Sequence, residues 1–371
     1  FMGKDDMDSA EKILSGWFTV QIIISAILTA VLLLFGRSML LTFGASENTI
    51  GYAVDYMSIY AVGTIFVQMT LGMNMFITAQ GFSKTSMLTV TIGAVCNIIL
   101  DPIFIFGFGM GVKGAALATI ISQAVSCGWV LAFLTGKKTF LRIKKEYLKP
   151  VPSIVFPCLA LGLSTFVMQS SESVISVCFN SSLLKYGGDL AVGAMTILTS
   201  TMQFAMLPLQ GIGQGAQPIM SFNYGAKKMD RVKKAYRLLM ICSFTYTMIF
   251  CLAVEIAPGF FVHLFNSSSQ ELFEMTKWAL RIYMAATGVF GIQLAVQQVF
   301  MALGQAKISL FIACLRKIIL LIPLIYILPH FFADKVFAVF LAEPVSDFIS
   351  VTVAATLFFL NIKKILKEGE V

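Results

Sequence analysis

Long apolar stretches recur along the whole chain, and short polar segments separate them. Each stretch has about 20 residues, the length that crosses a hydrocarbon layer of roughly 30 Å as a helix. We place the predicted spans at 14–35, 52–78, 86–107, 112–135, 153–179, 190–213, 236–257, 278–303, 307–328 and 336–361. The short alternating segments typical of membrane barrels are absent from the sequence. The pattern therefore predicts an all-α polytopic membrane protein with about ten transmembrane helices.

Composition agrees with this interpretation. Of the 371 residues, 58% are hydrophobic and 12% are charged, and the mean hydropathy is +0.85. A soluble domain is about 45–50% apolar and about 25% charged, so this chain has too much apolar surface for a water-soluble core. The seven cysteines all fall within predicted spans and none forms a CxxC pair. We expect them to be small core residues without a disulfide framework.

The formal net charge of +8 has an explanation in membrane topology. Positive residues cluster at 137–149, 227–237 and 363–367. If the N-terminus is cytoplasmic, all three clusters lie on the cytoplasmic side, as the positive-inside rule requires. The charge thus indicates an orientation with a cytoplasmic C-terminus, and we predict no nucleic-acid partner.

The chain resembles itself. The opening segment GKDDMDSAEK matches GAKKMDRVKK at a shift of 222 positions, and after one inserted residue a shift of 223 aligns Thr64 with Thr287 and Gly81 with Gly304. Both copies begin on the cytoplasmic side in the predicted topology. They are therefore expected to be parallel repeats, related by a pseudo-two-fold axis along the membrane normal.

The repeat also predicts the domain organisation. The second copy has two spans, within 153–213, that precede its matching region, and the first copy has none. We therefore expect six helices in each complete repeat, with the first repeat truncated by about two N-terminal helices. The predicted domains are an N-lobe of four helices (1–136), a cytoplasmic basic linker (137–152), a C-lobe of six helices (153–361) and a cytoplasmic tail (362–371).

Asp101 lies within a predicted span, where an aspartate costs about 2.5–3.5 kcal/mol and usually lines a cavity or an ion path. Asn97 is four residues earlier, on the same helical face. Pro102 lacks an N–H group and tends to kink the helix. Thr119 is in the next span and faces this point if the two helices pack as a hairpin. The carboxylate, amide and hydroxyl oxygens of these side chains suit Na⁺ as ligands, and a desolvated carboxylate suits H⁺.

The alternative is a buried aspartate that serves packing alone. In the second copy the positions equivalent to Asn97, Asp101 and Thr119 are occupied by apolar residues: Leu320, Leu324 and Ala342. The architecture therefore does not require the polar set, which favours a functional role.

Glu172 is a second acid within a span, and polar residues surround it in the sequence: Gln169, Ser170, Ser171 and Ser173. It is a candidate for binding the coupling cation, and a satisfied interhelical network is the alternative. Four further acids are closer to span ends, and we expect them to be solvated or interfacial: Asp55, Glu255, Glu343 and Asp347. Arg316 and Lys317 lie within a span, and either can pair with one of these acids.

Glutamine, methionine and aromatic residues gather in the second repeat. Soft methionine contacts and cation–π attraction suit varied apolar cations, although packing is the ordinary role of these residues in an apolar chain. The candidate substrate-cavity residues are Gln169, Gln203, Gln210, Gln293, Gln297, Met202 and Met206.

No motif indicates an enzyme. Gly109 to Gly114 fits GxGxxG, but the dinucleotide fingerprint needs a βαβ unit and an acid about 20 residues later. The flanking apolar runs are too long for strands, and no acid occurs from Ala115 to Lys145. We interpret the match as a turn between two spans.

Several segments resemble the multidrug and toxic compound extrusion (MATE) transporters, closest to their MepA-like bacterial branch. They are NIILDP (97–102), GVKGAALAT (111–119), YGGDLAVGAMTI (186–197) and QGIGQGAQPIMSFNYGAKKMDRV (210–232). The resemblance covers essentially the whole chain. It implies twelve helices in two six-helix lobes, and drug/Na⁺ or drug/H⁺ antiport by alternating access.

The resemblance also implies site residues. Some members bind a cation in the N-lobe through an Asn and an Asp four residues apart, a Thr eighteen residues beyond, and an Asp on the first helix. Asn97, Asp101 and Thr119 match three of these four, and the fourth would lie in the missing region. In another branch a Glu on the seventh helix contributes, and Glu172 falls on the corresponding helix. Its family partner on the tenth helix is an acid, where this chain has glutamines.

We therefore predict a cation-coupled antiporter, without catalytic residues, that exports small organic cations by alternating access between two lobes. The coupling ion is H⁺ or Na⁺, with Asn97, Asp101 and Thr119 as candidate Na⁺ ligands, and we expect no other cofactor. The predicted location is the bacterial cytoplasmic (inner) membrane, with the lipid bilayer as environment and no obligate protein partner. Two alternatives are a lipid-linked precursor or oligosaccharide flippase and a non-transporting truncated membrane fragment. A flippase needs a strongly basic cavity, and only Arg316 and Lys317 are basic deep within spans.

Overall fold

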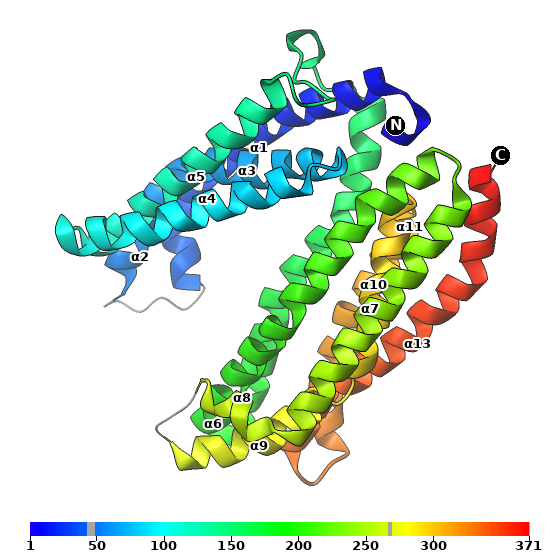
Figure 1. Ribbon diagram of the computed structural model, residues 1–371. Coiled ribbons are helices and arrows are strands. Elements are labelled where there is room, and N and C mark those ends of the chain that lie inside the picture. The colour runs from blue at the N-terminus through cyan, green and yellow to red at the C-terminus, as the bar shows by residue number, and fades with distance from the viewer. Residues whose placement is uncertain (43–48, 266–268, 371) are drawn as a thin grey trace. The chain divides into compact units, whose positions relative to one another are not determined.

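The computed structural model describes residues 1–42, 49–265 and 269–370, and the last residue of the predicted tail, Val371, lies outside this set. Every regular element in the described residues is a helix (Figure 1). The chain divides into two compact units, Phe1–Phe156 (unit 1) and Pro157–Val371 (unit 2).

The described residues of unit 1 form five α-helices and three short helical segments: Met2–Lys4, α1 (Met7–Thr42), α2 (Ile50–Val62), α3 (Thr64–Ala79), α4 (Ser83–Pro102), a π-helical segment (Ile103–Gly107), α5 (Gly111–Thr135) and Lys145–Tyr147. Helix α5 packs against α2, α3 and α4, and α1 packs against α2 and α3. Apolar side chains of α1, α3 and α5 meet in one core, which includes Leu14, Met69, Met73, Ile77, Val130 and Leu134. Helix α4 packs along α5, where the Ser126 hydroxyl donates to the Thr89 carbonyl at 3.0 Å, so the two helices that carry the candidate cation ligands lie beside each other.

Unit 2 follows the same principle with more helices: α6 (Pro152–Gly225, which begins in unit 1), α7 (Met229–Ile256), α8 (Pro258–His263), α9 (Gln270–Tyr283), α10 (Thr287–Ala302), α11 (Ala306–Cys314), a π-helical segment (Leu315–Leu321), α12 (Ile322–Ile327), a 3₁₀ turn (Leu328–His330) and α13 (Lys335–Glu370). Helix α10 is buried along most of its length and packs between α7 and α13. Phe179, Phe300 and Phe340 are fully buried in this unit.

Helix α6 reverses direction at Gly188. Its 74 residues would extend about 110 Å as a straight helix, far beyond a hydrocarbon layer of roughly 30 Å. Gly188 has φ 64° and ψ −161°, a conformation that breaks the helix and that glycine adopts without a side-chain clash. Figure 1 shows the two arms of α6 side by side. The break falls between the predicted spans 153–179 and 190–213, so the prediction of two spans here is confirmed.

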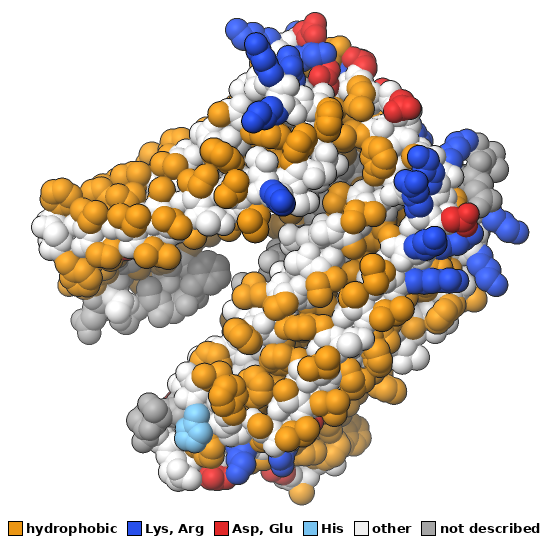
Figure 2. Space-filling view, viewed as in Figure 1, with side chains coloured by type: hydrophobic (Ala, Val, Ile, Leu, Met, Phe, Trp, Pro, Cys, Tyr) orange, Lys and Arg blue, Asp and Glu red, His pale blue; other side chains and the backbone are white. Residues whose placement is uncertain are grey.

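The described residues include seven helices long and apolar enough to cross a membrane, or up to nine spans if each of two bent helix pairs crosses once. The reversal at Gly188 makes α6 two of these spans, which gives ten. Figure 2 shows apolar side chains covering the length of both units, while Lys and Arg gather toward the ends of the helices. An apolar surface of this kind suits contact with lipid. Because a helix also satisfies its own backbone hydrogen bonds, helices with such surfaces can span a bilayer. The predicted all-α polytopic fold is confirmed.

Equivalent local geometry in the two units supports the internal repeat. Helices α2 and α3 form a pair bent by 54°, and α9 and α10 form a pair bent by 49°. The helices after the bends begin at Thr64 and Thr287, the two residues that the sequence repeat aligns. Gly81 and Gly304, also aligned, both have left-handed backbones, with φ of 87° and 75°.

One hydrogen bond between two helices of unit 1 has an equivalent in unit 2. In unit 1 the Thr29 hydroxyl of α1 donates to the Ala61 carbonyl at 2.8 Å. In unit 2 the Cys251 thiol of α7 donates to the Met284 carbonyl at 3.6 Å. These residue pairs are related by the repeat shifts of 222 and 223 positions. The same packing of a long helix against a bend is therefore present in both copies.

The GxGxxG match is a turn, as predicted. Gly109 and Gly111 have φ of 64° and 55°, in the left-handed region that favours glycine. A Cβ at Gly114 would lie 2.7 Å from the carbonyl of Phe104, so this glycine permits the close approach of α5 to the π-helical segment. The three glycines return the chain from α4 to α5 and set the spacing of the two helices.

Candidate functional site

The predicted pair on α4 is formed. The Asn97 Nδ2 atom donates a hydrogen bond to Asp101 Oδ1 at 3.1 Å, and both side chains are half-buried. No Lys or Arg of the described residues forms an ion pair with Asp101. Asp101 is thus a carboxyl group within a span whose identified partner is a neutral amide.

Thr119 is on the helix that packs against α4, so the expected hairpin is present. Its hydroxyl, however, donates to the Ala115 carbonyl of its own helix at 2.9 Å. The oxygen lone pairs of this hydroxyl can still accept a hydrogen bond or face a cation. Helix α4 changes into the π-helical segment directly after Pro102, where the sequence predicted a kink. Such π-helical insertions are frequent at functional sites.

Glu172, the second predicted cation ligand, pairs with a basic side chain. Its Oε1 atom lies 2.8 Å from Lys317 Nζ, and the side chains are 56% and 5% exposed, respectively. The Ser171 hydroxyl is occupied by the Val167 carbonyl of its own helix, and Gln169 is exposed. The cation that Glu172 contacts is therefore the ammonium group of Lys317, which belongs to the chain itself.

Arg316 binds two acids at once. Its Nη2 atom lies 2.8 Å from Glu343 Oε1, and its Nε atom lies 2.5 Å from Asp347 Oδ1. The guanidinium also lies 4.2 Å from the ring centroid of Phe290. Ser346 Oγ donates to the Arg316 carbonyl at 2.9 Å. This cluster connects the second π-helical segment with α10 and α13.

The expectation for Glu343 and Asp347 was wrong. They were predicted to be solvated or interfacial, but they are 3% and 1% exposed. Both point from one face of α13, four residues apart, at Arg316, and an arginine partner makes burial of carboxylates tolerable. The other two acids in that prediction are partly exposed: Asp55 lies 3.4 Å from Lys113, and Glu255 lies 4.0 Å from Arg281.

The structure divides the predicted substrate-cavity residues into two groups. Gln293 and Gln297 are buried on α10 and, with Arg316 and Lys317, line a cavity of about 10 Å³. That volume is close to the minimum that holds one water molecule, whereas drug-sized ligands need several hundred Å³.

The remaining predicted cavity residues are on α6. Gln203 and Gln210 are exposed, as is Gln169. Met202 and Met206 are half-buried and pack against the small core cluster that contains Phe290. Within unit 2 these two methionines therefore have a packing role.

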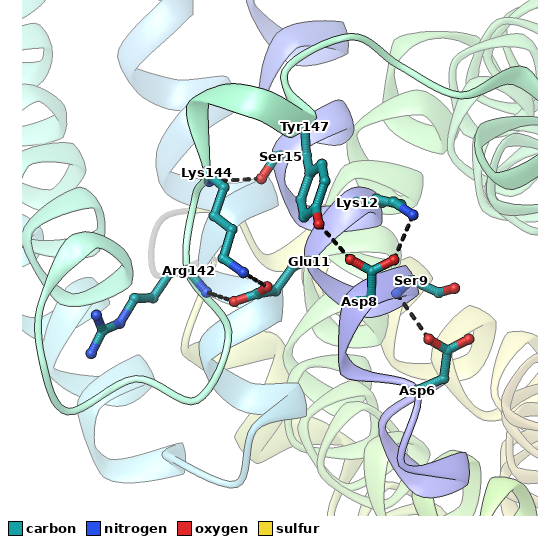
Figure 3. Close-up of polar contacts among 9 residues, drawn as sticks. All are labelled: Asp6, Asp8, Ser9, Glu11, Lys12, Ser15, Arg142, Lys144 and Tyr147. Carbon is teal, nitrogen blue, oxygen red and sulfur yellow. Dashed lines mark hydrogen bonds and ion pairs between the residues drawn. The ribbon is translucent and has the colours of Figure 1, made fainter.

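A polar cluster that the sequence did not reveal holds the linker segment (137–149) on unit 1 (Figure 3). Glu11 of α1 pairs with Lys144 Nζ at 2.5 Å and accepts the Arg142 backbone N–H at 3.3 Å. The Tyr147 hydroxyl donates to Asp8 at 2.5 Å. These acidic partners raise the pKa of the Lys144 ammonium and the pKa of the Tyr147 phenol.

Gln80, at the end of α3, binds the same segment. Its Oε1 atom accepts hydrogen bonds from Thr139 Oγ1, from the Phe140 N–H and from the Leu141 N–H, at 2.8, 2.8 and 3.0 Å. One buried amide oxygen thereby satisfies three donors of a loop. The linker segment is fixed to unit 1 from two sides, by α1 and by α3.

These features define a class: a polytopic helical membrane protein of two related units, each with ionisable residues inside its spans. The chain belongs to the MatE family, whose model matches residues 1–103 and 164–327. It is 24% identical over 358 residues to "Multidrug export protein MepA" of Staphylococcus haemolyticus, covering 96% of this chain and 78% of that protein. It is 25% identical over 331 residues to the protein of the same name from Staphylococcus aureus, covering 89% and 72%.

Solved structures agree. The structure of "MATE multidrug transporter DinF-BH" has 33% identity and a TM-score of 0.88, covering 97% of this chain and 80% of that chain. "MATE in the bent conformation" has 21% identity and a TM-score of 0.93, covering 100% and 82%. The predicted family is confirmed, and the relatives are named as transporters, in agreement with the prediction that the chain is not an enzyme.

Proposed function

We propose that the protein is a multidrug efflux transporter that exports organic cations in exchange for a coupling ion. The names of the MepA relatives and of the DinF-BH structure support the drug class of the substrate. The observation that carries the coupling is Asp101: a carboxyl group in a span, held by an amide, without a basic partner among the described residues. Its counterpart in the repeat is Leu324, so the fold itself does not need it.

The arrangement around Asp101 favours H⁺ as the coupling ion. Asn97 directs its amide NH₂ toward the carboxyl group and holds one oxygen, Oδ1. The second oxygen remains available for a proton. A Na⁺ ion prefers several hard oxygen ligands, so it would need the Asn97 carbonyl oxygen and the Thr119 hydroxyl turned toward Asp101. Proton binding requires neither change.

In the proposed mechanism the proton and the drug bias two states of the transporter in opposite senses. A ligand shifts a conformational equilibrium only through a difference in its affinity for the two states. Protonation removes the charge of Asp101, which makes burial of the side chain less costly. The deprotonated form favours a state in which this region is hydrated and a cationic drug is attracted. The two repeat-related units are the parts that we propose to alternate between these states.

Glu172 is the weaker candidate for this role. A coupling ion there would have to displace Lys317, which lies at 2.8 Å. Both basic residues deep within the spans of unit 2 are paired with acids, which also removes the free basic surface that a flippase for anionic lipid-linked precursors needs. We therefore assign ion coupling to Asp101. We also favour drug export over transport of lipid precursors as the function.

Orientation completes the proposal. Under the positive-inside rule the linker segment, the basic region 227–237 and the C-terminal lysines lie on the cytoplasmic side. The protein would then be a multi-pass protein of the bacterial cytoplasmic membrane, with its C-terminus inside the cell.

Replacement of Asp101 tests the function. In the full-length protein expressed in cells, Asp101→Asn should abolish efflux of a fluorescent organic cation, while the protein level in the membrane stays normal. Asp55→Asn is the matched control, because Asp55 is half-exposed and pairs with Lys113. Efflux that stays at the wild-type rate in Asp101→Asn would remove Asp101 from the mechanism. Loss of efflux in wild-type cells after collapse of the Na⁺ gradient alone would show that the ion is Na⁺.

A further inference from the structure

The two units carry opposite charges at repeat-related positions on the predicted cytoplasmic side. The shift of 222 aligns the start of α1 with the start of α7. Three acids of unit 1 correspond to lysines of unit 2: Asp5 to Lys227, Asp6 to Lys228 and Glu11 to Lys233. Two serines correspond to arginines: Ser9 to Arg231 and Ser15 to Arg237. The repeat itself therefore does not fix the charge at this place in the fold.

In unit 1 the start of α1 binds another segment of the same chain. Glu11 pairs with Lys144, and Asp8 accepts a hydrogen bond from the Tyr147 hydroxyl (Figure 3). The Ser15 hydroxyl accepts the Lys144 backbone N–H at 3.0 Å. The linker segment thus supplies positive partners for the acidic start of α1.

In unit 2 the segment that follows the last span adds positive charge instead. Helix α13 continues to Glu370, and its last turns carry Lys363, Lys364 and Lys367. The ring centroids of Tyr236 on α7 and Phe358 on α13 lie 5.4 Å apart, and the Tyr224 hydroxyl donates to the Ile365 carbonyl at 3.3 Å. The basic end of α13 therefore lies beside the basic start of α7. Figure 2 shows Lys and Arg side chains gathered at this end of unit 2.

Few of these bases are paired within the chain. Asp230 lies 3.5 Å from Lys233, and the Asp230 side chain is 94% exposed. Arg231, Lys234 and Arg237 are exposed and form no ion pair with the side chains that the structure describes. Like charges that converge in this way create a positive potential, which attracts anions from outside the chain.

The exposed face of α7 indicates which kind of anion fits. Arg231 and Lys234 begin a stripe at helical spacing, and exposed residues continue it along the span: Leu238, Ile241, Thr245, Ile249, Leu252 and Ile256. The apolar members are 51–79% exposed, as suits side chains that contact acyl chains. At a rise of 1.5 Å per residue, the two bases lie about 6–10 Å along the axis from Leu238. A phospholipid has its phosphate and its acyl chains in this order.

Helix α13 has the same pattern at its cytoplasmic end. Phe359 and Leu360 are 72% and 71% exposed. Lys363 and Lys367 are also exposed, and they follow Leu360 at three and seven residues, on the same face of the helix. Two neighbouring helices of unit 2 therefore each have an exposed apolar face that ends in basic side chains.

We propose that the cytoplasmic end of unit 2 binds an anionic phospholipid. Arg231 and Lys234 hold the phosphate, and the acyl chains lie along Leu238 and Ile241. A guanidinium can donate two parallel hydrogen bonds to a phosphate, and basic surfaces at the cytoplasmic ends of spans are typical sites for anionic headgroups. This binding is separate from drug export and from ion coupling, so its test does not depend on transport.

Lipid binding to the purified full-length protein in detergent tests the proposal. Phosphatidylglycerol, which is anionic, and phosphatidylcholine, which is zwitterionic, are compared with identical acyl chains. Native mass spectrometry resolves the bound lipids, and a titration gives the affinity of the tightest site. Wild-type protein should prefer phosphatidylglycerol. The double variant Arg231→Gln/Lys234→Gln should bind it about 30-fold more weakly, the loss expected for two bases at a membrane surface, and should bind phosphatidylcholine as wild type does.

The double variant Lys277→Gln/Lys335→Gln is the matched control. It removes the same charge from the same unit, at the opposite ends of the spans, where Lys277 lies 4.0 Å from Glu274 and Lys335 lies over the ring of Tyr186. It should keep the wild-type preference for phosphatidylglycerol. Thermal unfolding without added lipid shows whether both double variants are folded.

Equal affinity of wild-type protein for the two lipids would overturn the proposal, and so would a wild-type affinity for phosphatidylglycerol in Arg231→Gln/Lys234→Gln. Glycerol phosphate carries the phosphate without acyl chains. If it displaced phosphatidylglycerol at equal concentration, the site would be one for soluble anions and not for lipid. If Arg231→Gln/Lys234→Gln does not fold, ionic strength decides the question, since a preference of wild-type protein that persists at high salt contradicts a site held by exposed charges.

Discussion

Replacement of Arg316 by methionine is the most informative perturbation of unit 2. Methionine keeps much of the length of the side chain and removes the guanidinium, which lies 2.8 Å from Glu343 and 2.5 Å from Asp347. The change leaves at least one buried carboxylate without its counter-ion. It also removes the contact with the ring of Phe290.

The expected loss of stability follows from the burial of all three side chains. At an effective dielectric constant of about 20, two unit charges 2.8 Å apart attract by about 6 kcal/mol. Much of this attraction is offset by the removal of the ions from water. Measured losses after one partner of a buried ion pair is removed are about 3–5 kcal/mol, and we expect a value in this range.

The stability can be measured by denaturant unfolding in detergent, with tryptophan fluorescence as the signal. Trp278 is a suitable reporter for unit 2, because its ring packs edge-on against Phe340 at 5.8 Å in the core. A triple variant that also carries Glu343→Gln and Asp347→Asn has no orphaned charge, and we expect it to regain most of the lost stability.

Lys113→Met provides a matched control. It removes a lysine that pairs with Asp55 at 3.4 Å, with both side chains about half exposed, and should cost less than about 1 kcal/mol. A loss as small as this in Arg316→Met would refute the burial of the cluster. A triple variant no more stable than the single variant would show that lost packing, and not the unpaired charge, is the cause.

Two further predictions concern the linker and the helix packing. Gln80→Leu removes the acceptor of three hydrogen bonds, so trypsin should cut the linker segment faster than in wild type. Gln203 is exposed, and Gln203→Leu should leave the cleavage rate unchanged. Equal cleavage rates in the two variants would contradict the role of Gln80 in holding the linker segment. Gly291→Ala brings a Cβ against the backbone of α7 and should destabilise unit 2 by about 1–3 kcal/mol in the same unfolding assay. Gly211→Ala has open space around the new Cβ and should not destabilise it; equal losses in the two variants would contradict the close packing of α7 and α10.

The recurrence of apolar runs about 20 residues long predicted most of the fold, because each span must cover the same hydrocarbon thickness. The break between 179 and 190 was placed correctly around Gly188. The bend between α2 and α3 was missed, and 52–78 was treated as one straight span. The reason is tertiary: at Gly63 the side chain of Ile120 from α5 occupies the space that a Cβ would need, which no local pattern in 52–78 reveals.

The sequence showed which charged residues lie within the spans, but it did not show how all of them pair. Asn97 and Asp101 were paired correctly because four residues along one helix place side chains on one face. Glu343 and Asp347 have the same spacing, and this was a signal that they share a face. Their burial depends on Arg316, which another helical segment supplies, and distance from a span end was a poor guide to it. The polar cluster that holds the linker segment was missed for the same reason, since Glu11 and Lys144 are far apart in the chain.

Proteoliposomes that contain the full-length protein test the role of Asp101 most directly, because the flux of a cationic dye and the flux of protons can be recorded in the same vesicles. With an imposed pH gradient and no Na⁺, wild-type protein should move dye and protons in opposite directions with a fixed ratio. Asp101→Asn should show no proton movement linked to the dye. Dye transport by Asp101→Asn that still dissipates the pH gradient at the wild-type ratio would contradict the assignment of coupling to this residue.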